Sequence, residues 1–454
     1  MELLIFITSI PFVMLTIYFF HKGSGTLNPF KINFLSVIFY LSFITFTFLG
    51  SILILFDIDN HHMLSQLQNQ SVRVYGYITI VYTFFIIGLI IYLLPKVLGI
   101  KMNILLARYR SSTIVLEGYN NENVVLIPFI LLFFISLFSV IYTFIQLGYY
   151  PFTFLLRNIG NSTNLAITRI QASLQFEGIV YIRNIFANEL TILLSYIAYI
   201  YKRKTKRIIW RMLFLMLFIL SISILFYNFA KGPIFWYLLS YIILKIYLGD
   251  KITKKQIIFI GVIVSIGILL TYIFVMGMSL EDMTFNRSPL GRVILSQISG
   301  LYNHLDIFPE RHEFLRGKSF PGSFRILFGI DGPTVKSARV VMKEIYPRQV
   351  ERGLLGVMST FFQGEVYGNF GVLGLIFAPI YVGFLFQIIN IYFLKAVKSP
   401  LNLGLFVYLI MTIRGITTSQ FIQFIWHPIV FVLVFFIILA KVKSQIIYSI
   451  VIKK

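Results

Sequence analysis

Apolar runs of about 17 or more residues recur along the whole chain, and they restrict its fold more than any other feature. Each run is long enough to cross about 30 Å of hydrocarbon as a helix. The chain is therefore predicted to be an all-α polytopic membrane protein with about eleven transmembrane helices. These helices are expected at 2–20, 33–56, 75–95, 124–147, 179–201, 208–227, 232–248, 256–276, 366–394, 401–413 and 421–440.

Charge is scarce along the chain, at 12% of the 454 residues against about 25% in a soluble domain. Mixed composition occurs only near 277–355, where we expect a large, ordered extracytoplasmic cap. Residues 1–276 would then hold eight helices and an external segment at 148–178, and 356–454 three helices and a cytoplasmic tail. No basic residue precedes the first run and no cleavage site follows it, so we expect a retained anchor. The absence of cysteine excludes disulfides, iron–sulfur clusters and thiolate zinc sites.

A net charge of +22 is typical of nucleic-acid-binding proteins, but the placement of the cations indicates a membrane explanation. Alternate connections hold 22 of the 39 lysines and arginines, against only Glu117, Glu122 and Asp250. By the positive-inside rule these connections face the cytoplasm, with the N-terminus outside and the C-terminus inside. The predicted partner of this charge is the lipid bilayer, and no nucleic acid is expected.

The cations on the other side differ in kind, because 13 of those 17 are arginine whereas 17 of the inner 22 are lysine. Guanidinium binds phosphate and carboxylate in a bidentate manner, so this difference predicts an outer face that handles anions. Alternatively, arginine simply suits structured loops rich in carbonyls and carboxylates. Polar residues also continue from the outer loops into several helices, which predicts one cavity opening outward, or salt bridges that lock helices together.

Four short motifs lie on this outer side. They are the block from Phe308 to Ser319, the segment from Gln363 to Gly374, the turn Ala230-Lys231-Gly232-Pro233, and Arg414-Gly415. Together they resemble the Wzy-type oligosaccharide repeat-unit polymerases that assemble O-antigen, capsule or common-antigen polysaccharides. One departure is Lys231, which stands where the family pattern has an arginine; it keeps the charge but loses the bidentate geometry.

The resemblance implies a GT-C-like glycosyltransferase in the bacterial inner or plasma membrane, active on the extracytoplasmic face. Similar enzymes transfer a growing glycan from one undecaprenyl diphosphate carrier to a sugar hydroxyl of another lipid-linked repeat unit. The transfer would invert the anomeric centre in one step, with polyprenyl diphosphate as the leaving group and no cofactor or metal. Whether a chain-length regulator also binds stays open.

This chemistry calls for cations around the leaving diphosphate and for a base at the acceptor hydroxyl. The diphosphate candidates are Arg169, Arg183, Lys231, Arg287, Arg292 and Arg414. The acid–base candidates are His312, Glu313, Glu365 and His304, and the tyrosines that would stack on sugars are Tyr149, Tyr150, Tyr302 and Tyr367.

Four alternatives remain at this stage, and one of them is a purely structural or scaffolding membrane protein. Asp57-Ile58-Asp59 is an acid pair of the kind that holds a divalent cation on sugar diphosphates, although two acids at a helix end are common. O-antigen ligases share the architecture but deliver finished chains to another acceptor. A lipid-linked oligosaccharide flippase or transporter is the third, but it would be expected to show internal repeats and charges at the midplane.

Overall fold

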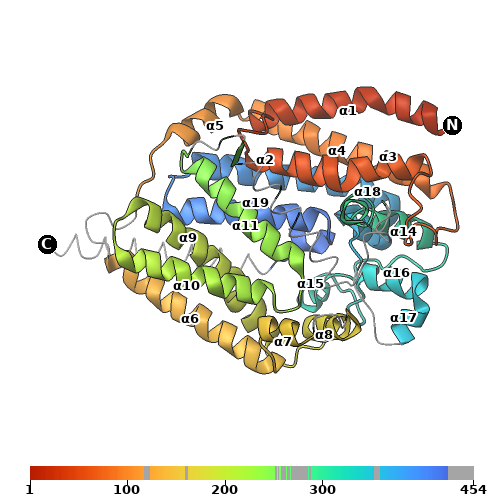
Figure 1. The fold of residues 1–454 in the computed structure, drawn as a ribbon. Helices are drawn as coiled ribbons and strands as arrows, with labels where there is room; N and C mark the ends of the chain where they lie inside the picture. Colours follow the sequence, from red (N-terminus) through yellow and green to blue (C-terminus); the bar gives the residue numbers. More distant parts are fainter. Residues whose placement is uncertain are drawn as a thin grey trace.

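The computed structural model describes residues 1–116, 123–158, 162–250, 288–351 and 358–427, with residues 253, 255, 256, 262, 266 and 285. Across these residues all regular structure is helical (Figure 1). The elements are α1 (Glu2–Ser24), α2 (Phe34–Val37), the π-helix η1 (Ile38–Phe48), α3 (Leu49–Leu55), α4 (Val72–Val97), α5 (Met102–Ser111), α6 (Asn123–Leu147), α7 (Pro151–Arg157), α8 (Ser162–Leu174), the π-helix η2 (Ile182–Leu190), α9 (Thr191–Lys204), α10 (Ile208–Leu225), α11 (Lys231–Tyr247), α13 (Pro289–Ile294), α14 (Ser299–Ile307), α15 (Gly322–Leu327), α16 (Ser337–Ile345), α17 (Pro347–Glu351), α18 (Phe361–Lys395), α19 (Pro400–Thr417) and the 3-10 turn η3 (Phe421–Phe424).

Seven helical stretches in the described part of the chain are long and apolar enough to cross a membrane. They are Glu2–Ser24, Phe34–Leu55, Val72–Val97, Asn123–Arg157, Ile208–Leu225, Phe361–Lys395 and Pro400–Thr417. The fold thus has the helices that a polytopic all-α membrane protein requires. The count of eleven spans and the GT-C likeness stay predictions, because 256–276 and most of 421–440 lie outside the described residues.

Close helix packing in the first layer depends on two glycines. The helix α1 packs along α4, and a Cβ atom at Gly23 would lie 2.5 Å from Ile91. At Gly88 an added Cβ would lie 3.2 Å from the ring of Phe20, which is completely buried. Small residues let helix backbones approach in a membrane, where no hydrophobic effect drives helices together. The helices α1 and α4 form one side of the bundle together with the consecutive helical elements α2, η1 and α3 (Figure 1).

The helix α18 is not continuous, contrary to the single helix predicted over 366–394. Gly371 has φ 59° and ψ −144°, a conformation that essentially only glycine adopts. Beyond it the chain turns back: the side-chain amide of Gln363 donates to the carbonyl oxygen of Leu375 at 3.1 Å. In a straight helix these residues would be about 18 Å apart. The element therefore consists of a short first arm, Phe361 to Phe370, lying against the start of a long second arm, Val372 to Lys395.

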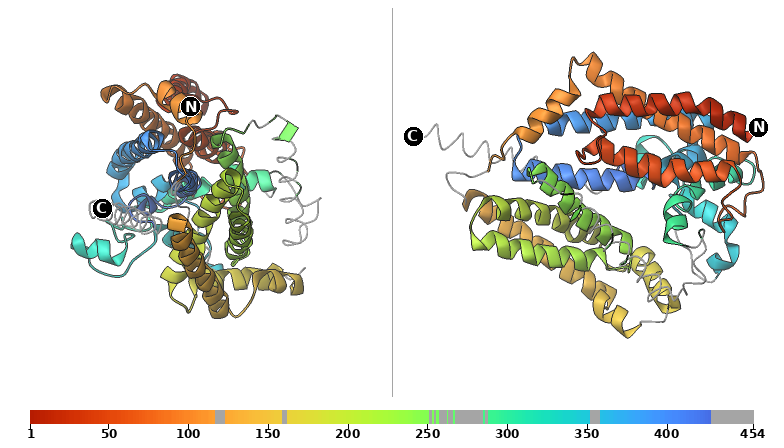
Figure 2. Two further views of the ribbon diagram at one scale, coloured as in Figure 1. Left: turned by 90° about the vertical axis from the view of Figure 1, so that its left-hand side faces the viewer. Right: turned by 45° about the horizontal axis from the view of Figure 1, so that its top comes forward.

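The two ends of the molecule differ in chemistry. At one end Arg203 at the end of α9 pairs with Asp250 at 2.9 Å, and Lys398 donates to the carbonyl oxygens of Arg110 and Ser112. At the opposite end the short helices α14 to α17 gather near the N-terminus (Figures 1 and 2). The basic connections α4–α5, α9–α10 and α18–α19 thus share one end of the bundle. That this end faces the cytoplasm stays a prediction.

Candidate functional site

Two of the four sequence motifs bind directly to each other. The cap loop that contains Leu315 and Arg316 lies on the first arm of α18, where the helix is about to break. The backbone N–H of Leu315 donates to the carbonyl oxygen of Gly368 at 2.9 Å, and that of Arg316 donates to the carbonyl oxygen of Asn369 at 3.1 Å. Carbonyls near a helix end lack intrahelical partners, so the cap loop supplies the missing donors.

The side chain of Asn369 fixes the same contact from the helix side. Its Oδ1 accepts a hydrogen bond from the backbone N–H of Gly317 at 3.1 Å, and its Nδ2 donates to the hydroxyl of Ser319 at 2.9 Å. The same Nδ2 also donates to the carbonyl oxygen of Glu365, one turn earlier. Asn369 is only 2% exposed, so these bonds are made away from water and hold the cap rigidly on the arm.

The candidate bases His304 and His312 lie on either side of one ring. Phe308 stacks on His304 with centroids 5.8 Å apart and meets His312 edge-on at 5.3 Å. In His304 the Nδ1 atom lies 2.6 Å from the carbonyl oxygen of Gly300, and in His312 it lies 2.8 Å from that of Glu313. A carbonyl only accepts, so Nδ1 carries the proton and the neutral ring presents Nε2 as a base in both residues.

The two histidines differ in access. His304 is completely buried, and burial lowers its pKa to about 4 although the bond to Gly300 acts the other way. Its Nε2 atom has no hydrogen-bond partner. The ring of His312 is partly exposed on the cap surface. A substrate hydroxyl can therefore reach His312 directly, whereas His304 lies behind Phe308.

The two carboxylates predicted as acid–base candidates have different surroundings. Glu365 on the first arm is 2% exposed, and its Oε2 accepts a hydrogen bond from the backbone N–H of Ile422 at 2.9 Å. This bond joins the arm to the segment after α19. Glu313 is exposed on the cap. Of the two, only Glu313 is open to solvent in this arrangement.

The four predicted sugar-stacking tyrosines fall in three places. Tyr302 is completely buried, with its ring so close to α4 that a Cβ at Gly76 would lie 2.3 Å from it. Tyr367 lies beside the cap loop, edge-on to Phe314 at 5.6 Å. Tyr149 and Tyr150 instead tie the external segment to α10, through the carbonyl oxygen of Tyr227 at 2.8 Å and the hydroxyl of Ser223 at 3.1 Å. Tyr302 thus serves packing in this structure, and Tyr367 lies against the cap loop.

Arg414 is a buried cation at the end of α19. Its side chain is 8% exposed, and its guanidinium carbon lies 3.7 Å from the ring centroid of Trp236 and 5.8 Å from that of Phe46. Its Nε atom is buried without a hydrogen-bond partner. No carboxylate of the described residues forms an ion pair with it. Aromatic faces attract the cation but supply no acceptor for the buried Nε–H.

Three further arginines lie near one another around the external segment. Arg183 is 6% exposed, donates to the carbonyl oxygen of Ala172 at 2.8 Å, and stacks at 5.4 Å over Tyr227. Desolvation lowers the pKa of Arg169, and the nearby charge of Arg292 lowers it further. Tyr227 therefore lies near both Arg169 and Arg183, and Arg292 lies near Arg169. These interactions bring the three arginines into one neighbourhood.

Arg292 and Arg414 flank the same short stretch of chain. Arg292 belongs to α13, whose Ile294 carbonyl oxygen would lie 2.2 Å from a Cβ at Gly50. Phe46, under the guanidinium of Arg414, lies one turn before Gly50. Arg169, Arg183 and Arg292, from α8, η2 and α13, thus lie near one another, whereas the contacts of Arg414 on α19 are with Phe46 and Trp236. Arg287 and the side chain of Lys231 lie outside the described part.

The carboxylates of Asp57 and Asp59, which the sequence offers as a metal site, form ion pairs with an arginine of the protein. Arg73 pairs with Asp57 and with Asp59, each at 2.9 Å. Burial raises the pKa of Asp59, and its bonds to Arg73 oppose that shift. Within the described residues, no group of three or more histidine, aspartate or glutamate side chains is arranged to hold a metal ion.

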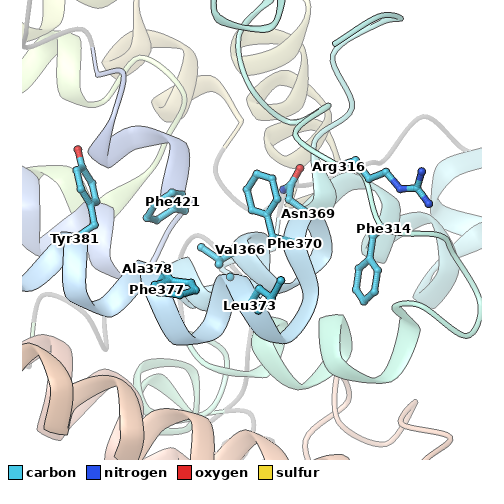
Figure 3. Close-up of a pocket in the computed structure, with 11 residues that line it drawn as sticks. Phe314, Arg316, Val366, Asn369, Phe370, Leu373, Phe377, Ala378, Tyr381 and Phe421 are labelled. Atoms are coloured by element: carbon cyan, nitrogen blue, oxygen red, sulfur yellow. The ribbon is translucent and has the colours of Figure 1, made fainter. Parts of the chain in front are cut away.

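A groove of about 650 Å³ runs along α18 from the cap loop (Figure 3). Both arms contribute to it, and so do Phe421 and the cap-loop residues Phe314 and Arg316. Its lining is almost entirely apolar, with Arg316 at one end and Tyr381 at the other. Neither Arg316 nor the groove belongs to the site predicted from the sequence. The sequence signal was an arginine directly before Gly317 in the motif block.

Comparison with protein-family models, with curated proteins and with solved structures finds no match to this chain. Its function therefore has to be argued from the residues and their geometry.

Proposed function

We propose that the chain polymerises undecaprenyl-diphosphate-linked oligosaccharide repeat units at the extracytoplasmic membrane face. The observation that carries this proposal is Arg414, a buried guanidinium in the outer part of a helical bundle with no carboxylate beside it. An ionised side chain in this position is costly and usually serves a ligand or a pathway. A diphosphate supplies the missing negative charge and the acceptors for the unused N–H groups.

The neighbouring arginines support the same assignment. As the anomeric C–O bond breaks, negative charge develops on the leaving diphosphate, and preorganised donors stabilise that charge. Arg169, Arg183 and Arg292 provide such donors beside the Arg414 region. The leaving group is a lipid, so the apolar helices around the site provide the surroundings that its chain requires.

The base for the acceptor hydroxyl is His312 in this proposal. Its Nδ1–H is engaged by the carbonyl of Glu313, its Nε2 is available, and its ring is partly exposed. His304, behind Phe308, acts as a positioning residue for that ring. Direct attack by the activated hydroxyl then inverts the anomeric centre in one step, and no metal takes part.

The test is reconstitution of the purified full-length protein in lipid nanodiscs with lipid-linked repeat units, a chelator and no nucleotide sugar. We expect longer glycans to form, and Arg414→Ala to abolish them while Arg203→Ala at the opposite end does not. Wild-type activity in both Arg414→Ala and Arg183→Ala would overturn the diphosphate assignment. Transfer of finished chains without elongation would instead identify a ligase.

A further inference from the structure

The groove along α18 has a charged end and an apolar length. Arg316 extends its guanidinium at the cap end (Figure 3), and that guanidinium makes no hydrogen bond or ion pair with the described residues. Beyond it the lining is Phe370, Leu373 and Phe377, which are all exposed on the surface of a helix apolar enough to span a membrane. A cation at the cap end of an exposed apolar groove, pointing beyond the apolar lining (Figure 3), matches a lipid with an anionic head.

We propose that this groove holds the lipid carrier of the acceptor, with Arg316 on its diphosphate and the polyprenyl chain along the second arm of α18. On the second arm the groove extends from Leu373 to Tyr381, which corresponds to about 12 Å of helix, or somewhat less than half the hydrocarbon thickness. This assignment rests on the proposed function, since a polymerase needs a second polyprenyl diphosphate carrier for its acceptor.

We assign the acceptor's carrier to this groove because the groove has one arginine, Arg316, whereas the donor site around Arg414 has several. The leaving diphosphate gains charge and requires several fixed donors, which the Arg414 region provides. The acceptor diphosphate keeps its bonds throughout the transfer, so a single exposed guanidinium is enough to hold it. Its reacting hydroxyl lies at the far end of the repeat unit, so its carrier must be bound away from the donor diphosphate.

The first arm of α18 separates the two sites. Its beginning is joined to the end of α19, where the backbone N–H of Phe361 donates to the carbonyl oxygen of Thr418, one turn beyond Arg414. Its other end carries Asn369, which holds the cap loop and lines the groove. The intervening helix is about 12 Å long. An oligosaccharide anchored at Arg316 would have to span about this length to reach the donor site.

Two pairs of variants test the site in nanodiscs. Arg316→Ala removes the cation, and Lys318→Ala removes an exposed cation two residues away that does not line the groove. Leu373→Trp fills the groove, and Val372→Trp adds the same bulk to the preceding residue, which is equally exposed (63% against 67%) but does not line it. The probe is undecaprenyl diphosphate, counted per protein by native mass spectrometry, with undecaprenol and phosphatidylglycerol as competitors.

We expect two carriers per wild-type protein, and one in Arg316→Ala, Leu373→Trp or Arg414→Ala. Loss of the charge-assisted bonds should weaken the second binding event about tenfold or more. Two carriers in Arg316→Ala and Leu373→Trp, or equal competition by phosphatidylglycerol, would overturn the groove assignment. Chain elongation at wild-type rates in Arg316→Ala and Leu373→Trp would also overturn the groove assignment. That result would leave the polymerase proposal intact. The protein could also bind a carrier only when Arg316 is present and yet elongate no glycan. That result would reject the polymerase proposal and retain the lipid site.

Discussion

The guanidinium carbon of Arg414 lies over the ring of Trp236, 3.7 Å from its centre. Trp236 belongs to the second turn of α11, whose outer end begins at Lys231. The stack therefore places a cation from α19 beside the amino end of another helix, where backbone N–H groups also favour an anion. One aromatic ring thus orients the group on which the proposed diphosphate site depends.

Replacing Trp236 by leucine should reduce kcat/KM for chain elongation about five- to thirtyfold. A desolvated cation–π contact contributes roughly 1 to 2 kcal/mol, and its loss lets the guanidinium leave its orientation. Trp236→Phe keeps an aromatic face and should retain most activity. Initial rates with purified lipid-linked repeat units measure the effect. Equal rates in the leucine and phenylalanine variants would count against an orienting role.

Asn369→Ala should loosen the cap from the first arm. The change removes one acceptor and two donated bonds at a buried position, which costs about 1 to 3 kcal/mol. Hydrogen exchange at Leu315 and Gly317 should accelerate, and the thermal midpoint should fall. Asn103→Ala on the exposed side of α5 is the control and should change neither. Unchanged exchange in the cap loop would show that Asn369 does not hold it.

Two glycines should respond to alanine with opposite signs. Gly371→Ala forces a side chain into a positive-φ conformation 3.1 Å from the ring of Phe314, and should destabilise the fold by about 1 to 3 kcal/mol. Gly415 lies within α19 with open space around it, so Gly415→Ala should stabilise by about 0.5 to 1 kcal/mol. Thermal unfolding in detergent compares them. Two shifts of the same sign would contradict the break in α18.

Acid should destabilise the cap through His304. Its pKa in the folded protein is about 4, below the ordinary value of 6.5, so the unfolded chain binds the proton more readily. The contribution of neutral His304 to the free energy of unfolding is therefore fully present above about pH 6.5. It is lost as the pH drops toward 4, and the total loss is on the order of 3 kcal/mol. His304→Gln should flatten this dependence in melting curves between pH 7.5 and 4.5. An unchanged slope in that variant would mean that other groups dominate.

The two carboxylates that pair with Arg73 should contribute differently to the free energy of unfolding, although both lie 2.9 Å from its guanidinium. Asp59 is 3% exposed and Asp57 is 76% exposed. Asp59→Asn leaves a mostly buried guanidinium half-paired and should cost about 1 to 3 kcal/mol, whereas Asp57→Asn should cost under about 0.5 kcal/mol. Melting curves with and without a chelator should coincide for the wild type. A chelator-sensitive midpoint would instead favour a metal on this pair.

The sequence predicts helix positions well where an apolar run is uninterrupted, as in α1, α4 and α6. It fails at Gly371, because the hydropathy continues through a residue whose backbone reverses the chain. Periodicity also does not reveal which motifs meet. The contacts of Asn369 with the cap loop join residues about 50 positions apart, and they depend on that reversal. For the same reason the groove below Arg316 is not visible in the sequence, since both arms of α18 are needed to form it.

The reversal at Gly371 also bears on how the chain is assembled in the membrane. The first arm ends with carbonyls at Gly368 and Asn369 that are bonded by amides from Leu315 and Arg316, which leave the ribosome earlier. The cap loop must therefore lie at the end of the arm before those carbonyls can be satisfied. The arm thus completes its hydrogen bonds on a portion of the chain that was synthesised before it.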